Sequence, residues 1–259
     1  MLKNYFWIIS GKARLNIISF LLILFFTVII SCKKDPPLTT TGGVPNQVKI
    51  HLKHLVDNNP IAYDTIQFVN AAGNHFSVER LNYYLSNITF NTSDGRQFID
   101  HNVHYVDGRD STTLTINISN PGTGHVVSFS ALLGVPSERD TFGLLPNTMA
   151  NQNMFWPENL GGGYHFMKME GSFTSGITSY GYAMHLGKPG FQSLLQGNAE
   201  IYLNGVSHEL DFNMNMNEIF KNPYTYDLDL DGNYTMGDTL LMRRISNNAC
   251  DMCSIIQTR

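Results

Sequence analysis

Short runs of alternating apolar and polar residues dominate the chain after residue 47, and helical periodicity is rare. Such runs, ended by Gly, Asn, Asp or Pro, are typical of strands because successive strand side chains point to opposite faces of a sheet. The pattern predicts strands at 48–56, 67–69, 88–91, 113–118, 126–132, 164–170, 180–186, 200–206 and 208–214, and short helices at 78–85 and 216–220. We therefore expect an all-β (mainly β) chain, an antiparallel β-sandwich with one or two short helices.

The beginning of the chain has the pattern of an export signal. Its cationic residues, Lys3, Lys12 and Arg14, precede an almost unbroken apolar run of 14 residues at 17–30. The run ends in Ser31-Cys32, which fits the lipobox of bacterial lipoproteins. An uncleaved membrane anchor is the alternative, but the run is shorter than the ~20 residues that cross a bilayer. The sequence thus predicts a signal peptide over 1–31 and a lipidated Cys32 that anchors the protein in the cell envelope, at the outer membrane on its periplasmic or surface side.

Composition divides the remaining chain into a tether and a domain. Residues 32–47 are polar and rich in Pro, Gly and Thr, as in a flexible tether, and 48–259 are predicted to form one domain. Without 1–31 the chain has 14 Lys and Arg against 21 Asp and Glu, a net charge of −7. This charge argues against nucleic acid as a partner.

Histidines supply the first candidate chemistry. In 48–56, alternation places His54 on the apolar face and His51 on the polar face. His165 shares its face with two methionines, whereas His185 lies opposite the apolar side chains of its own run. Each histidine taken alone can be an ordinary core residue, but three that converge would suit a metal, and imidazole and thioether are suitable ligands for copper.

A family resemblance gives these residues a context. The segments NMFWPENLGGGYHFMKMEG (153–171) and GYAMHLG (181–187) resemble the MbnP-like copper-binding proteins, and so do HLVD (54–57), FSVERLNYYLS (76–86) and FSALLGVP (129–136). The likeness covers about 48–250, nearly the whole predicted domain. It implies a β-sandwich envelope protein, and in some relatives a copper ion held by two histidines beside a tryptophan that can be oxidised to kynurenine.

Transferred to this chain, the resemblance implies a copper site drawn from His54, His165 and His185, beside Trp156. His125 is a reserve ligand, because alternation places it on the face of Phe129. Trp156 is the one tryptophan after residue 31. Its alternative role is a hydrophobic plug that closes one end of the sandwich.

A second metal signal lies nearer the C-terminus. Asp227, Asp229, Asp231 and Asp238 occupy positions 1, 3, 5 and 12 of a calcium-loop pattern that has Gly at position 6. An acidic turn without metal is the alternative. Calcium is therefore a secondary cofactor hypothesis.

Cys250 and Cys253 are the cysteines that remain after Cys32. Outside the cytoplasm such a pair can be a disulfide, a thiolate metal clip or a free dithiol. We favour the disulfide, because a lone pair of cysteines lacks the further ligands of a closed tetrahedral site.

These features favour a copper-binding envelope lipoprotein that is not an enzyme, acting in copper acquisition or handling, with an envelope redox or transport protein as a possible partner. The alternative is a protein- or glycan-interaction module with a structural calcium loop. A hydrolase is disfavoured, because the sequence has no evident Gly-x-Ser-x-Gly motif, His-Glu-x-x-His motif or pair of catalytic carboxylates. Glu170 is interpreted as a turn or strand-end residue.

Overall fold

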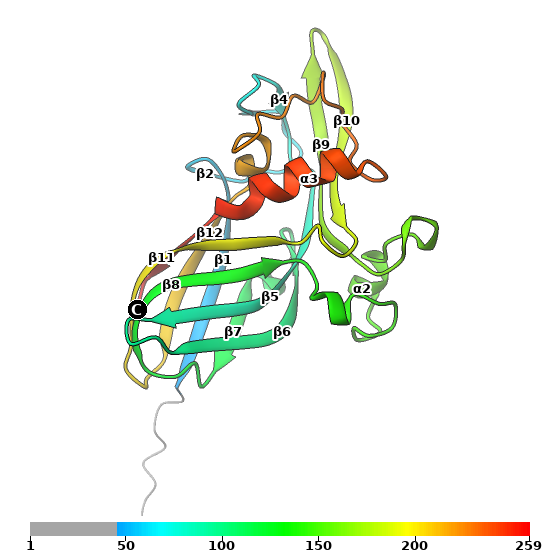
Figure 1. Cartoon of the computed structure of the whole chain (residues 1–259). Coiled ribbons are helices and arrows are strands. Elements are labelled where there is room, and N and C mark those ends of the chain that lie inside the picture. The colour runs from blue at the N-terminus through cyan, green and yellow to red at the C-terminus, as the bar shows by residue number, and fades with distance from the viewer. Residues whose placement is uncertain (1–45) are drawn as a thin grey trace, which may run out of the picture. The chain divides into compact units, whose positions relative to one another are not determined.

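Two curled sheets form a β-sandwich-like fold with short helices, which confirms the predicted fold class (Figure 1). The computed structural model describes residues 46–259. The predicted signal peptide, most of the predicted tether and Cys32 lie outside the described residues.

One sheet has five strands in the order β13-β12-β1-β2, with β7 also paired to β1. Its strands are β1 (Gln47–Val56), β2 (Asn59–Pro60), β7 (Thr115–Ser119), β12 (His208–Asn215) and β13 (Cys253–Gln257). The pairing of β1 with β12 is parallel, a departure from the predicted antiparallel arrangement. Within β1 the predicted alternation is confirmed, because His54 is buried with Ile50 and Leu52 whereas Lys53 is exposed.

The other sheet has eight strands in the order β11-β8-β5-β9-β4-β3, with β6 on β5 and β10 on β9. They are β3 (Phe68–Val69), β4 (His75–Phe76), β5 (Arg80–Thr92), β6 (Gln97–Asp107), β8 (Gly124–Leu133), β9 (His165–Ser175), β10 (Thr178–Gly187) and β11 (Ser193–Leu203).

Strand β5 is the branch point of this sheet. Its first residues, Arg80–Tyr83, pair with β9, whereas the residues from Leu85 onward pair with β8 on that side. The sheet therefore splits, and the β9–β10 hairpin diverges from β8 and β11 (Figure 1). Two of the three predicted copper ligands, His165 and His185, lie on this hairpin.

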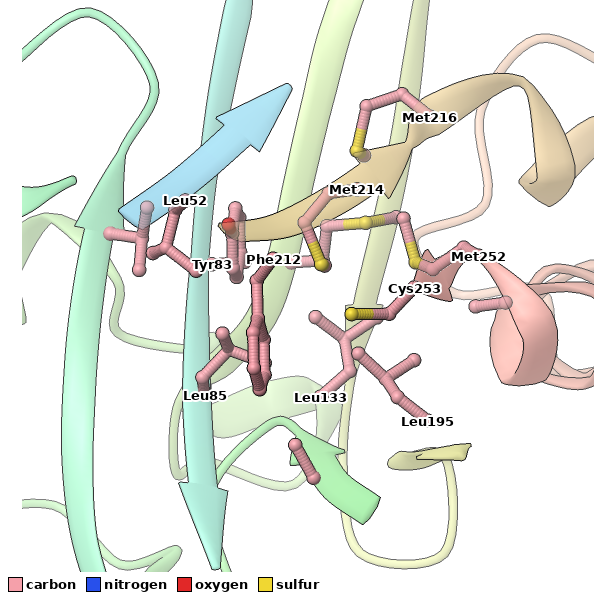
Figure 2. Close-up of a cluster of buried hydrophobic side chains, with 14 of the residues drawn as sticks. Leu52, Tyr83, Leu85, Leu133, Leu195, Phe212, Met214, Met216, Met252 and Cys253 are labelled. Atoms are coloured by element: carbon pink, nitrogen blue, oxygen red, sulfur yellow. The ribbon is translucent and has the colours of Figure 1, made fainter. Parts of the chain in front are cut away.

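The core fills the space between the two sheets. Phe212 from the five-stranded sheet packs against Phe129 from the eight-stranded sheet, with ring centroids 5.4 Å apart. Figure 2 shows Phe212 in a cluster of buried side chains with Leu52, Tyr83, Leu85, Leu133, Leu195, Met214, Met252 and Cys253. Methionine suits such a place because its flexible thioether fills irregular gaps.

Helices are few and short. They are α2 (Met149–Asn153) and α3 (Thr239–Asn248) and the 3₁₀ turns η1 (Ser111–Thr113), η2 (Ser137–Arg139), η3 (Glu158–Leu160), η4 (Met216–Phe220) and η5 (Ala249–Asp251). The predicted helix at 216–220 is thus confirmed as a 3₁₀ turn. None of the helices within 46–259 is long and apolar enough to cross a membrane.

The other predicted helix, at 78–85, is wrong. Most of it is the beginning of β5, where Leu81 to Ser86 are all buried. A strand buried on both faces has no alternation, so its apolar run is easily mistaken for a helix. Strands β6 and β13 were not predicted either.

Candidate metal centre

Two of the predicted ligands, His165 and His185, lie side by side on the β9–β10 hairpin. Their ring centroids are 5.0 Å apart and the rings are nearly perpendicular, at 86°. Only 3% of His165 and 7% of His185 is exposed. The β9–β10 ladder shifts register between Leu186 and Gly187, which places Gly187 opposite His165. Strict alternation ends at this irregularity, so the two rings can meet although the sequence pattern placed them on different faces.

Each of the two rings uses one nitrogen in a hydrogen bond and leaves the other without a partner. His165 Nδ1 lies 3.2 Å from the carbonyl oxygen of Met154, and His185 Nε2 lies 2.9 Å from Glu170 Oε1. A carbonyl and a carboxylate only accept hydrogen bonds, so these two nitrogens carry the protons. His165 Nε2 and His185 Nδ1 are buried and have no hydrogen-bond partner within 46–259. In the neutral form of each ring, this second nitrogen presents a lone pair.

Burial keeps His165 neutral. Loss of water, together with the nearby positive charge of Lys168, lowers the pKa of His165 to about 3. Lys168 donates from Nζ to the carbonyl oxygen of Asn153, 2.5 Å away, and its own pKa is lowered by burial. A neutral imidazole is the form that binds a metal ion.

Trp156 packs against His165 of the histidine pair. Its ring centroid lies 4.7 Å from that of His165, and only 2% of the residue is exposed. The indole N–H donates to the carbonyl oxygen of Leu160 at 3.2 Å. The indole also fills the space over Gly187, where a Cβ atom would lie 2.2 Å from Trp156 Cε3. Gly187 therefore makes room for the tryptophan beside the pair.

Asp140 supports the loop that joins Trp156 to His165. Its Oδ1 accepts the N–H of Tyr164 at 2.8 Å, and its Oδ2 is buried without a hydrogen-bond partner in the described part of the chain. Gly163, at φ +87°, lies so close that a Cβ atom there would be 2.5 Å from Asp140 Oδ1. Burial raises the pKa of Asp140 to about 6. The backbone of Trp156 joins the same loop, since its N–H donates to the Gly163 carbonyl at 2.9 Å.

His54 does not join this pair. It lies on β1 in the five-stranded sheet, and its Nε2 is 2.8 Å from Tyr83 Oη. Burial lowers its pKa to about 4. The sequence-based expectation that three histidines converge is therefore not met, and His54 is a core residue that shares a hydrogen bond with a buried tyrosine.

The reserve ligand His125 lies at the surface. Its ring stacks on Tyr202 with centroids 4.4 Å apart, and its Nε2 lies 2.8 Å from Glu200 Oε1. The β8–β11 register shifts beside Val126, so His125 does not share the buried face of Phe129 as alternation suggested.

The donors that are present fit a metal ion of low coordination number. Residues 46–259 contain no group of three His, Cys, Asp or Glu side chains placed to hold a metal ion. The candidate centre is thus a pair of unpartnered imidazole nitrogens, His165 Nε2 and His185 Nδ1, beside an indole. Imidazole suits copper, zinc, iron and nickel.

Comparison with known proteins agrees with the resemblance found in the sequence. A model of the MbnP family matches residues 45–237. The chain belongs to this family. Among solved structures, MbnP from Methylosinus trichosporium is similar, with a TM-score of 0.53 and 9% sequence identity, over 82% of this chain and 99% of that protein. At this identity the likeness concerns the fold. No curated protein gives a significant match.

The acidic loop at the end of the MbnP match is engaged in local contacts. Asp227 Oδ1 accepts the N–H of Asp229 at 2.9 Å, and Asp231 pairs with Arg244 at 2.6 Å. Asp238 caps α3 by accepting the N–H groups of its first turn. These carboxylates act in a turn, an ion pair and a helix cap, and the structure does not gather them around one point.

The predicted disulfide is not formed, because both cysteines are free thiols. Cys250 lies in η5, with its Sγ 3.8 Å from the Ser246 carbonyl oxygen. Cys253 begins β13, and its side chain points into the core beside Met214 (Figure 2). Burial raises the pKa of both thiols, so they stay protonated.

Sequence reasoning missed two residues that support the centre of this MbnP-family chain. Glu170 lies inside β9 beside His185, not at a strand end. Thr235 bonds the His185 backbone twice: its Oγ1 accepts the His185 N–H at 2.7 Å and donates to the His185 carbonyl oxygen at 2.6 Å. The pairing register of β9 with β10 would have suggested Glu170, but no sequence signal indicates Thr235.

Proposed function

We propose that this protein is a copper-binding lipoprotein of the bacterial envelope, without catalytic activity of its own, in which His165 and His185 hold the ion beside Trp156. It acts in copper acquisition or handling. Anchoring through Cys32 is part of the proposal and follows from the lipobox pattern.

The observation that carries the proposal is the pair of unpartnered nitrogens. A buried polar atom without a hydrogen bond costs about 1–3 kcal/mol, so such atoms are rare in folded proteins. Here two of them belong to rings 5.0 Å apart. A bound cation would satisfy both at once, and no proton has to leave His165, because that ring is already neutral.

The donor set favours copper over the other metals that imidazole binds. A closed zinc site requires a tetrahedral set of ligands, whereas copper(I) accepts two or three. No third carboxylate, thiolate or imidazole of residues 46–259 completes the pair. The burial of both histidines and of Trp156 leaves little access for the water molecules that complete the coordination of a harder ion.

Elemental analysis of the purified protein tests the proposal. After anaerobic exposure to copper(I) and dialysis, we expect one copper per chain in the wild type and a loss of at least tenfold in affinity for His165→Ala and for His185→Ala. His125→Ala is the matched control, because it also removes an imidazole bonded to a glutamate. Wild-type protein without copper, or full copper in the His165→Ala, His185→Ala double variant, would overturn the proposal.

A further inference from the structure

The two imidazoles of the centre are held by chemically different partners. A neutral backbone carbonyl, that of Met154, accepts from His165, whereas a carboxylate, that of Glu170, accepts from His185. Glu170 is in turn paired with Arg80, at 3.1 Å from Oε2. Hydrogen bonds to a carboxylate are stronger than those to a neutral oxygen. The proton of His185 is therefore held more firmly, and its other nitrogen is made the better donor.

Three strands fix the position of Glu170. In the β9 ladders it lies opposite Arg80 of β5 on one side and opposite Ala183 of β10 on the other. His185 is two residues beyond Ala183, so it is a diagonal neighbour of Glu170 on the same face of the sheet. Thr235 holds the His185 backbone from the outer side. The contact between glutamate and imidazole is thus built into the sheet and does not depend on a mobile loop.

We propose that Glu170, anchored by Arg80, is the positioning residue of this centre: it keeps the proton of His185 on Nε2, so that Nδ1 faces the ion. Without the carboxylate, His185 could move its proton to Nδ1, the position that must be vacant for binding. This inference rests on the proposed copper function for its purpose, but the placement of the proton is a property of the metal-free protein. Partners of this kind typically contribute 10–100-fold to metal affinity.

Nitrogen NMR of histidine-labelled, metal-free protein measures the proton position directly. In the wild type we expect His185 as the Nε2–H tautomer. Glu170→Leu removes both the charge and the acceptor, so the resonances of His185 should shift towards a mixture of tautomers. Glu170→Gln keeps an acceptor oxygen and should retain the wild-type tautomer. Glu200→Gln, at the surface pair with His125, is the matched control and should leave His185 unchanged.

Copper affinity, measured by competition with a chelator, gives the second readout. We expect a loss of roughly 10–100-fold for Glu170→Leu, a smaller loss for Glu170→Gln and none for Glu200→Gln. Thermal unfolding checks that each variant is folded, which we expect because Glu170 is at the partly exposed face of the sheet.

The outcomes separate the two proposals. A wild-type His185 with its proton on Nδ1, or an unchanged tautomer in folded Glu170→Leu, would overturn the role of Glu170 whatever the copper result. Copper affinity that stays at the wild-type level in Glu170→Leu would overturn it too. The expected tautomers in a wild-type protein that binds no copper would overturn the proposed function instead.

Discussion

Gly187→Ala is a small change that should disturb the centre through Trp156. The glycine lies on β10, two residues after His185, and opposite His165 in the ladder. A Cβ atom there would lie 2.2, 2.6 and 2.7 Å from three carbon atoms of the indole. The backbone of Gly187 is not in the left-handed region, so the cost is one of space and not of conformation.

The size of the effect follows from these distances. Carbon atoms in contact stay about 3.5–4.0 Å apart, so the indole must retreat by roughly 1 Å or more. It is almost wholly buried and tied to Leu160 by its N–H, which leaves little room for such a shift. Overpacking of this kind costs about 1–3 kcal/mol. For a domain of this size that lowers the melting temperature by about 2–4 °C per kcal/mol.

Chemical unfolding followed by circular dichroism measures this effect, also in variants that lack Trp156. Gly181→Ala is the control on the same strand, because its Cβ would lie at ordinary contact distances, 3.5 Å from Tyr234 Oη and 3.9 Å from the Gly171 carbonyl oxygen. In a Trp156→Leu background the cost of Gly187→Ala should fall to within about 0.5 kcal/mol of zero, since the clashing ring is gone. If Gly187→Ala costs no more than Gly181→Ala in the wild-type background, the argument about the indole is refuted.

Three further predictions concern other parts of the chain. The pKa of Asp140 rises from 3.8 to about 6 on folding, so between these values the folded chain binds a proton that the unfolded chain has lost. As pH rises through that window, this group should lower the free energy of unfolding by up to about 3 kcal/mol. Asp140→Asn should remove this dependence in unfolding curves measured from about pH 4 to 7. Asp238→Ala should lower the free energy of unfolding by about 1 kcal/mol by removing the cap of α3, equally with and without millimolar calcium. If calcium raises the melting temperature of the wild type, and the double variant Asp229→Ala, Asp231→Ala abolishes that rise, the view that the loop binds no calcium is contradicted. Cys32→Ala should move the protein out of the membrane fraction, and a variant that stays in the membrane would contradict the lipobox reading.

The sequence determined the fold class and much of the strand content. Alternation within 48–56 correctly predicted the buried face of β1, including His54, because this strand has one face in the core and one in water. The same reasoning failed for 78–85, which begins a strand covered on both sides. Alternation identifies a strand only when its two faces meet different surroundings.

The sequence also supplied Trp156, His165 and His185 as members of one centre, through the resemblance to the MbnP family. It could not show that His54 lies in the other sheet, where Tyr83 accepts or donates its hydrogen bond. Burial alone does not place two side chains together, and a histidine on an apolar face has the same pattern whether or not it faces a metal.

Only the tertiary structure decided which ring nitrogens of His165 and His185 are free to bind a metal ion and which groups accept hydrogen bonds from the other two. That depends on the register of β9 with β10, on its shift beside Gly187, and on the branch of β5 that brings Arg80 to Glu170. Strand register is set by contacts between residues far apart in sequence, and a shift of one residue reverses the face of every side chain. Local pattern therefore predicts that a residue is buried, whereas its partners follow from the pairing of strands.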